Sequence, residues 1–167
     1  MVTYNRLELT KQTIADLETK TKSDFRLIIV DNNSTDQTKE YLSDLKLNSK
    51  YCKSIDVMYN SSNLGISVAR NQCLKMTDKY FDEYLSTIDN DVNFPDNWLQ
   101  KCIDVIEANK NIAVGVSFEP TIYPIQNLNG FKVELKPAGN LGTACTVFSR
   151  QLHAMIGYFC MDYGLYG

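Results

Sequence analysis

The sequence has few of the residues on which several common kinds of site depend. His153 is the only histidine among 167 residues, so a histidine metal site or a Ser-His-Asp triad has little to draw on. The five cysteines are widely spaced, and no two of them have the Cys-x-x-Cys separation of a zinc or redox motif. We therefore expect reduced, mostly buried thiols in a cytosolic protein. We expect His153 to lie either on a helix surface or in the core with its ring nitrogens hydrogen-bonded.

Long apolar stretches and an excess of positive charge are also missing. No run approaches the roughly 20 apolar residues that span a bilayer, and the chain opens without the basic and apolar blocks of a signal peptide. A formal net charge of −3 means that the chain lacks the excess of basic residues that is typical of nucleic-acid-binding proteins. The apolar and charged fractions, 44% and 22%, are ordinary for a globular protein. We expect one cytoplasmic domain, with peripheral membrane association left open.

Strand-like and helix-like segments alternate along most of the chain. Leu27 to Val30 is a short apolar run that ends at Asp31, as a buried parallel strand does. Ser34 and Gln37 have capping-box spacing, which predicts a helix running towards Leu47. Similar patterns predict further strands at 55–59, 84–88 and 112–118, and helices near Leu9, Ile66 and Asn97. This order is typical of an open, mostly parallel α/β sheet with helices on both faces.

The character of the sequence changes after about residue 120. Residues 120–142 contain three of the four prolines, which predicts loops and short antiparallel pieces. A buried strand at 144–148 and a short helix at 151–156 should follow. The chain opens on the end of a strand and closes on a turn-like string, so we expect a fragment of a longer domain.

Polar residues follow three of the predicted strands. They are Thr3-Tyr4-Asn5, Asp31-Asn32-Asn33 and Asp89-Asn90-Asp91. Ligands of open parallel sheets bind beyond the carboxyl ends of the strands, so these groups should share one edge. Two carboxylates in an Asp-x-Asp pattern can share Mg²⁺ or Mn²⁺ with a diphosphate, and the cation would neutralise charge on the leaving diphosphate. Taken alone, such a pattern is more often a solvated acidic turn, and an isolated Asp31 is more often a turn or cap residue.

The order of these motifs resembles that of family 2 glycosyltransferases with the GT-A fold, a Rossmann-like nucleotide-sugar-binding fold. The matching segments are Thr3 to Arg6, Ile29 to Asp36, Asn63-Leu64-Gly65 with Ala69-Arg70-Asn71, Asp89-Asn90-Asp91, Gly142 to Cys145, and Gly157 to Gly167. The resemblance implies one GT-A-like domain. Its nucleotide-sugar-binding part would be residues 1–118, and residues 119–167 would form an incomplete acceptor-side part.

The resemblance also implies roles for individual residues. Thr3, Tyr4 and Asn5 would border the base and ribose, and Asp31 would hydrogen-bond the base. The nucleotide and its phosphates would lie beside Asn63, Gly65 and Arg70, although a helix-surface salt bridge is an equally open role for Arg70. Asp89 and Asn90 would contact the ribose or sugar, and Asp91 would bind Mn²⁺ or Mg²⁺ together with Asp89. The donor sugar or acceptor would lie near Gly142, Thr143 and Ala144.

The resemblance implies an enzyme of hexosyltransferase type. It would move a sugar from a UDP-, GDP- or dTDP-sugar to a glycan or lipid-linked hydroxyl, with inversion favoured. The family's general base would lie just past Gly167, and Asp162 is only a weak substitute. A non-catalytic nucleotide-sugar-binding module, or an inactive truncated relative, therefore stays open. A nucleotidyltransferase is a weaker alternative because Thr3 to Arg6 contains no glycine. The sugar, base, acceptor, linkage and oligomeric state are not fixed by the sequence.

Overall fold

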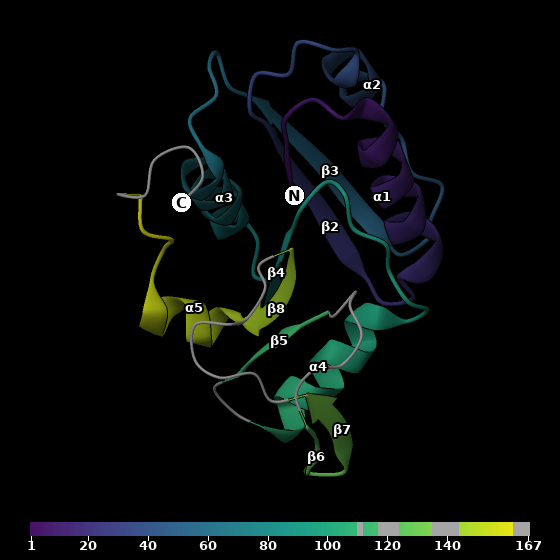
Figure 1. Ribbon diagram of the computed structural model, residues 1–167, viewed down its shortest axis with the longest axis vertical. Helices are drawn as coiled ribbons and strands as arrows, with labels where there is room; N and C mark the ends of the chain where they lie inside the picture. The colour runs from purple at the N-terminus through teal and green to yellow at the C-terminus, as the bar shows by residue number, and fades with distance from the viewer. Residues whose placement is uncertain (110–111, 117–123, 135–143, 162–167) are drawn as a thin grey trace.

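A computed structural model describes residues 1–109, 112–116, 124–134 and 144–161 (Figure 1). One half of the molecule is built on a parallel three-stranded sheet in the order β1-β2-β3. Its strands are β1 (Val2–Thr3), β2 (Phe25–Asp31) and β3 (Cys52–Tyr59). All three end at the same edge, because Thr3 pairs with Asp31 and Asp31 pairs with Tyr59.

Helices cover both faces of this sheet, as the sequence predicts (Figure 1). Successive side chains of a strand point to opposite faces. Ile29 therefore packs in one core with Ile14 of α1 (Leu7–Lys20) and Leu42 of α2 (Thr38–Ser43). Its neighbour Val30 packs with Ala69 of α3 (Ile66–Met76), which is followed by the 3₁₀ turn η1 (Thr77–Lys79).

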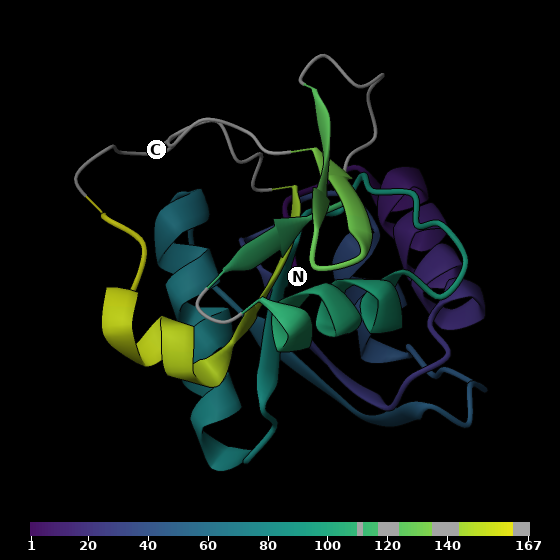
Figure 2. The same ribbon diagram turned by 90° about the horizontal axis from the view of Figure 1, so that it is seen from below.

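The other half contains a second three-stranded sheet in the order β4-β8-β5. Its strands are β4 (Tyr84–Ile88), β5 (Ala113–Gly115) and β8 (Cys145–Ser149). Helix α4 (Trp98–Ala108) lies against this sheet, beside the hairpin of β6 (Ile125–Leu128) and β7 (Phe131–Glu134) (Figure 2). Helix α5 (Arg150–Ile156) follows β8, with the Ser149 hydroxyl accepting from the Leu152 N–H as its N-cap. Among the described residues, no helix is long and apolar enough to cross a bilayer.

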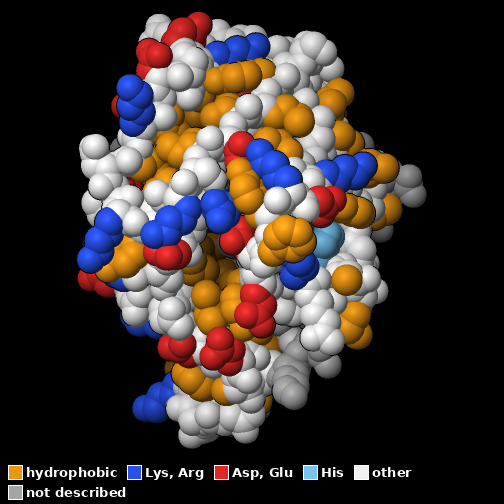
Figure 3. All heavy atoms as spheres, turned by 180° about the vertical axis from the view of Figure 1, so that it is seen from behind, with side chains coloured by type: hydrophobic (Ala, Val, Ile, Leu, Met, Phe, Trp, Pro, Cys, Tyr) orange, Lys and Arg blue, Asp and Glu red, His pale blue; other side chains and the backbone are white. Residues whose placement is uncertain are grey.

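The α/β class and the short antiparallel pieces after residue 120 are confirmed, but among the described residues parallel pairing is limited to β1, β2 and β3. Strand β8 lies between β4 and β5 and is antiparallel to both. In the described residues, no ladder joins β2 to β4, and a cavity of about 570 Å³ with a mainly apolar lining lies between them. The face drawn in Figure 3 has a hollow where apolar side chains are exposed among charged ones.

The predicted capping box at Ser34 is wrong. Helix α2 begins at Thr38, its N-cap Gln37 makes no side-chain cap bond, and the helix ends at Ser43 rather than near Leu47. The Ser34 hydroxyl is already engaged, because it donates to Asp31 and accepts from the Asn5 N–H. A hydroxyl held by the sheet edge cannot also cap the following helix.

Candidate functional site

The ends of β1 and β2 are joined by hydrogen bonds between their loops. The Asn5 N–H donates to Ser34 Oγ at 2.8 Å, and Asn5 Oδ1 accepts from the Thr35 N–H at 2.7 Å. Asp31 is fully buried and accepts from the Ser34 N–H at 3.0 Å. Asn5 and Arg6 both have left-handed backbones, with φ of 56° and 60°, which turn the chain sharply from β1 into α1. A buried carboxylate with fixed neighbours thus lies at the end of β2, and Tyr4 in the loop after β1 is exposed.

A network of asparagines holds the loop after β3 against the loop after β2. Asn32 Nδ2 donates to Asn63 Oδ1 at 2.7 Å, and Asn60 Nδ2 donates to Asn32 Oδ1 at 3.0 Å. Asn63 Oδ1 also accepts from the Gly65 N–H at 3.0 Å. Gly65 has φ of 84°, a conformation that glycine adopts without strain, and it immediately precedes α3. The network places the start of α3 at the same edge as Asp31.

Arg70 of α3 and Asp89 form a half-buried ion pair at this edge. Arg70 Nη2 lies 2.5 Å from Asp89 Oδ1, with 8% and 29% of the two side chains exposed. Burial raises the pKa of Asp89, the charge of Arg70 opposes that rise, and nearby Asp91 adds to it. The Asp89 N–H donates to the Ala144 carbonyl at 2.7 Å, which fixes Asp89 to the start of β8. Arg70 does form a salt bridge, but it is buried at the candidate site and not on the helix surface.

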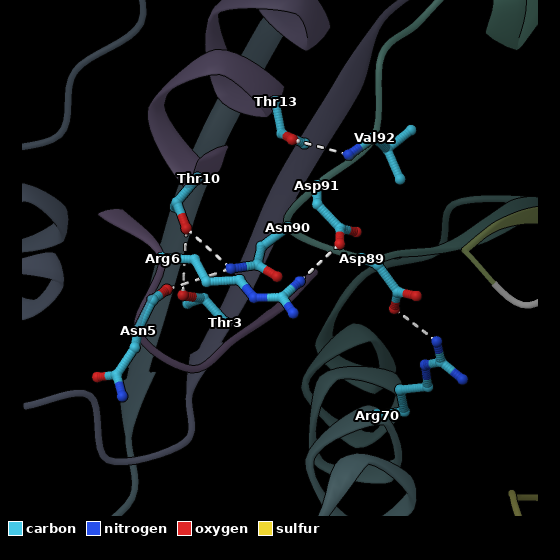
Figure 4. Close-up of polar contacts among 10 residues, drawn as sticks. All are labelled: Thr3, Asn5, Arg6, Thr10, Thr13, Arg70, Asp89, Asn90, Asp91 and Val92. Atoms are coloured by element: carbon cyan, nitrogen blue, oxygen red, sulfur yellow. Dashed lines mark hydrogen bonds and ion pairs between the residues drawn. The ribbon is translucent and has the colours of Figure 1, made fainter. Parts of the chain in front are cut away.

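The three residues after β4 point to different partners (Figure 4). Asp89 faces Arg70, whereas Asp91 Oδ2 lies 2.8 Å from Arg6 Nη1 in an exposed ion pair. Between them, Asn90 Nδ2 donates to Thr10 Oγ1 at 3.0 Å and to the Asn5 carbonyl at 3.3 Å. Asn90 therefore ties residues 89–91, here called the acidic loop, to the loop after β1. The carboxylates on either side of it face the two arginines.

The residues fit a divalent metal that is shared with a ligand. Within the described ranges, no group of three or more His, Cys, Asp or Glu side chains could hold a metal ion. Mg²⁺ and Mn²⁺ need only one or two carboxylates when phosphate oxygens and waters supply the remaining ligands. Asp91 is suited to this role because 40% of its side chain is exposed and its partner, Arg6, is on the surface.

The other predicted site residues have different settings. Thr3 is buried, with its hydroxyl 3.4 Å from the Thr10 hydroxyl and its carbonyl accepting from the Asn32 N–H. Ala144 lies directly before β8 and bonds Asp89. Gly142, Thr143, Asp162 and Gly167 fall outside the described residues.

Sequence reasoning missed three residues that organise the site: Arg6, Thr10 and Ser34. Arg6 and Ser34 lie inside motifs that the sequence analysis quotes, but nothing local shows that they contact Asp91 and Asp31. Thr10 is fully buried inside α1 and accepts from Asn90, 80 residues away. No pattern in the sequence signals that contact.

Comparison with known proteins identifies the family and the fold of the chain. The family model described as glycosyl transferase family 2 matches residues 1–147. A curated protein of Haemophilus influenzae, named as an uncharacterized glycosyltransferase, is 25% identical over 115 residues. That match covers 69% of this chain and 34% of the relative.

Two solved structures share the fold. The mannosyltransferase PcManGT from Pyrobaculum calidifontis, in complex with GDP-Man and Mn²⁺, gives a TM-score of 0.70 at 17% identity, over 98% of this chain and 47% of that one. TarS residues 1–349 from S. aureus gives 0.66 at 20% identity, over 96% and 49%. The chain thus spans about a third of the curated relative and about half of each of these structures.

Proposed function

The chain belongs to glycosyl transferase family 2, and from this membership we propose that it forms the donor-binding part of a glycosyltransferase. The enzyme would move a sugar from a nucleoside-diphosphate sugar to a hydroxyl acceptor. The observation that carries the proposal is that three acids, at the ends of β2 and β4, and one buried arginine of α3 are brought together by contacts between the loops of two sheets. These residues are Asp31, Asp89, Asp91 and Arg70.

The nucleoside end of the donor would lie over β1 and β2. Asp31 is held by Ser34 at the bottom of this region, and it would accept a hydrogen bond from the base. Tyr4 is nearly half exposed in the adjoining loop and would cover the base or ribose. Asn63 and Gly65 would border the nucleotide, because the asparagine network brings them to the same edge. A donor in this position has its phosphates directed towards α3 and the acidic loop.

The diphosphate would lie between Arg70 and Asp91. A guanidinium can donate two hydrogen bonds to a phosphate, and Arg70 is already buried and oriented at the edge. Asp91, with Asp89, would hold Mn²⁺ or Mg²⁺, which supplies charge neutralisation of the leaving diphosphate. The complex of PcManGT with GDP-Man and Mn²⁺ supports a metal-bound nucleotide sugar as the class of donor.

Gly142, Thr143 and Ala144 would lie near the donor sugar or the acceptor. We propose a glycan or lipid-linked hydroxyl as the acceptor and inversion by single displacement, with a general base that follows Gly167 in the family pattern. We also propose that the enzyme is located in the cytoplasm, as expected from the sequence.

Calorimetric titration with UDP and with GDP, each with and without Mn²⁺, tests the donor site. We expect Mn²⁺-dependent binding of one nucleotide, and loss of the Mn²⁺ dependence in Asp91→Asn. Asp96→Asn is the matched control, because Asp96 is an exposed acid paired with Lys20 at 3.0 Å. Equal Mn²⁺ dependence in Asp91→Asn and wild type would refute the metal assignment. Failure of both nucleotides to bind would refute the donor site.

A further inference from the structure

We propose that Asn71 is a positioning residue that holds residues 157–161, here called the strap, against α3 and thereby keeps Arg70 directed at Asp89. The proposal rests on the role of Arg70 in the donor site proposed above. Within the part of the chain that the structure describes, Asn71 forms no hydrogen bond with either carboxylate of the acidic loop.

The Asn71 side chain satisfies both backbone polar groups of one strap residue. Asn71 Nδ2 donates to the Phe159 carbonyl at 2.9 Å, and Asn71 Oδ1 accepts from the Phe159 N–H at 2.9 Å. A carboxamide offers both a donor and an acceptor, so it bonds the N–H and the carbonyl of one residue as a neighbouring strand would. Asn71 is 6% exposed, and water therefore replaces these two bonds poorly. The strap is anchored at this position to a helix 88 residues away in sequence.

The anchored residue contacts the arginine of the candidate site. The Phe159 ring centroid is 5.5 Å from the Arg70 guanidinium carbon, within the range of a cation–π contact. The same guanidinium lies 2.5 Å from Asp89. Arg70 is therefore held between a carboxylate and an aromatic ring, and the ring is placed by Asn71.

The strap makes further contacts with α5 and α3. Gly157 ends α5 with φ of 77° and donates its N–H to the His153 carbonyl at 2.8 Å. The Tyr158 ring meets the His153 ring edge-on at 5.0 Å, and Lys75 Nζ lies 5.6 Å from the Tyr158 centroid. Phe159 also packs against the cluster formed by Leu74, Leu85, Phe148 and Leu152. Loss of the Asn71 bonds would free the strap at Phe159, while the contacts of Tyr158 and α5 would persist.

The first test compares Asn71→Ala with Asn109→Ala. Asn109 is also a buried amide that bonds a backbone carbonyl, that of Val105 at 2.8 Å, but it lies at the end of α4. We expect Asn71→Ala to weaken nucleotide binding about tenfold. A change of this size corresponds to the free energy of roughly one hydrogen bond. Asn109→Ala should leave the affinity unchanged at a similar loss of stability. Equal affinities of both variants and wild type would overturn the proposal.

The second test uses Asn71→Asp and pH. A protonated carboxyl can donate to the Phe159 carbonyl and accept from its N–H, as the carboxamide does, whereas an ionised one has no donor and repels the carbonyl. Burial beside a carbonyl oxygen favours the protonated form of a carboxyl over the ionised form. The ratio of variant to wild-type affinity should approach one at low pH and fall as pH rises. Arg70, Lys75 and His153 are present in both proteins, so the ratio isolates the effect of the new carboxyl. A ratio that does not change with pH would contradict the proposal.

A direct probe separates this inference from the donor site itself. The Arg70 guanidinium can be followed by ¹⁵N–¹H NMR of arginine side chains, assigned with Arg70→Lys, in the absence of nucleotide. We expect a restrained Arg70 signal in wild type and Asn109→Ala, and an averaged one in Asn71→Ala. A restrained signal without nucleotide binding in wild type would refute the donor site but keep the positioning role. An unchanged signal in Asn71→Ala would refute the positioning role alone.

Discussion

Arg6 Nη1 lies 2.8 Å from Asp91 Oδ2, so a surface guanidinium neutralises the carboxylate proposed to hold the metal. Arg6 reaches this place because its left-handed backbone, with φ of 60°, ends the first loop beside the acidic loop. A metal ion and Arg6 would compete for the same oxygen.

Replacing Arg6 with alanine should tighten the binding of Mn²⁺ alone. An exposed ion pair is worth about 0.2–1 kcal/mol, so the gain should be up to about fivefold. The free Mn²⁺ signal in an electron paramagnetic resonance titration measures it. Lys11→Ala, which breaks an exposed pair with Glu8 on α1, should change nothing. Weaker Mn²⁺ binding in Arg6→Ala would show that Arg6 does not compete with the metal.

The raised pKa of Asp89 should appear as a pH dependence of stability. Burial is the main cause of the rise. A carboxyl whose pKa is higher in the folded than in the unfolded state costs stability as it ionises, so the loss appears as pH rises through the folded value. The free energy of unfolding of Asp89→Asn, minus that of wild type, should therefore be smallest at low pH and increase up to neutral pH. Urea unfolding at several pH values checks this, and a difference that decreases with pH would give Asp89 a lowered pKa.

Ser34→Ala should destabilise the protein and weaken nucleotide binding. The Ser34 hydroxyl accepts from the Asn5 N–H at 2.8 Å and donates to the buried Asp31 carboxylate. Removing it leaves both groups short of a partner, at a cost of about 1–3 kcal/mol in the free energy of unfolding. Chemical denaturation measures the cost. Ser43→Ala removes an exposed hydroxyl of α2 and should be nearly neutral, and equal effects of the two variants would count against the role of Ser34.

Thiol labelling should separate the cysteines by burial. Burial raises the pKa of Cys102 to about 11 and that of Cys145 to about 12, so almost no thiolate forms at either residue near pH 8. Cys160 is exposed on the strap and should react first with a disulfide reagent. Mass spectrometry of labelled peptides reports the order. Labelling of Cys145 as fast as that of Cys160 would contradict the packing of β8 between β4 and β5.

The sequence by itself determined the kinds of element and the site edge. Apolar β-branched runs such as Leu27 to Val30 form strands because alternate side chains enter cores on the two sides of the sheet. Asp31 and Asp89 each follow such a run, and the ends of successive strands are set by local pattern. That is why acids at the strand ends could be predicted from the sequence, although β4 belongs to a second sheet.

Only the tertiary structure decided which partner each polar residue has. Asp89 and Asp91 are two residues apart, yet one faces Arg70 and the other Arg6. Strand β8 pairs antiparallel with β4 across more than fifty residues of chain, and Asn71 bonds Phe159 across 88. Local periodicity gives the type and facing of an element, but contacts between distant residues depend on how whole elements are placed, which no short stretch of sequence encodes.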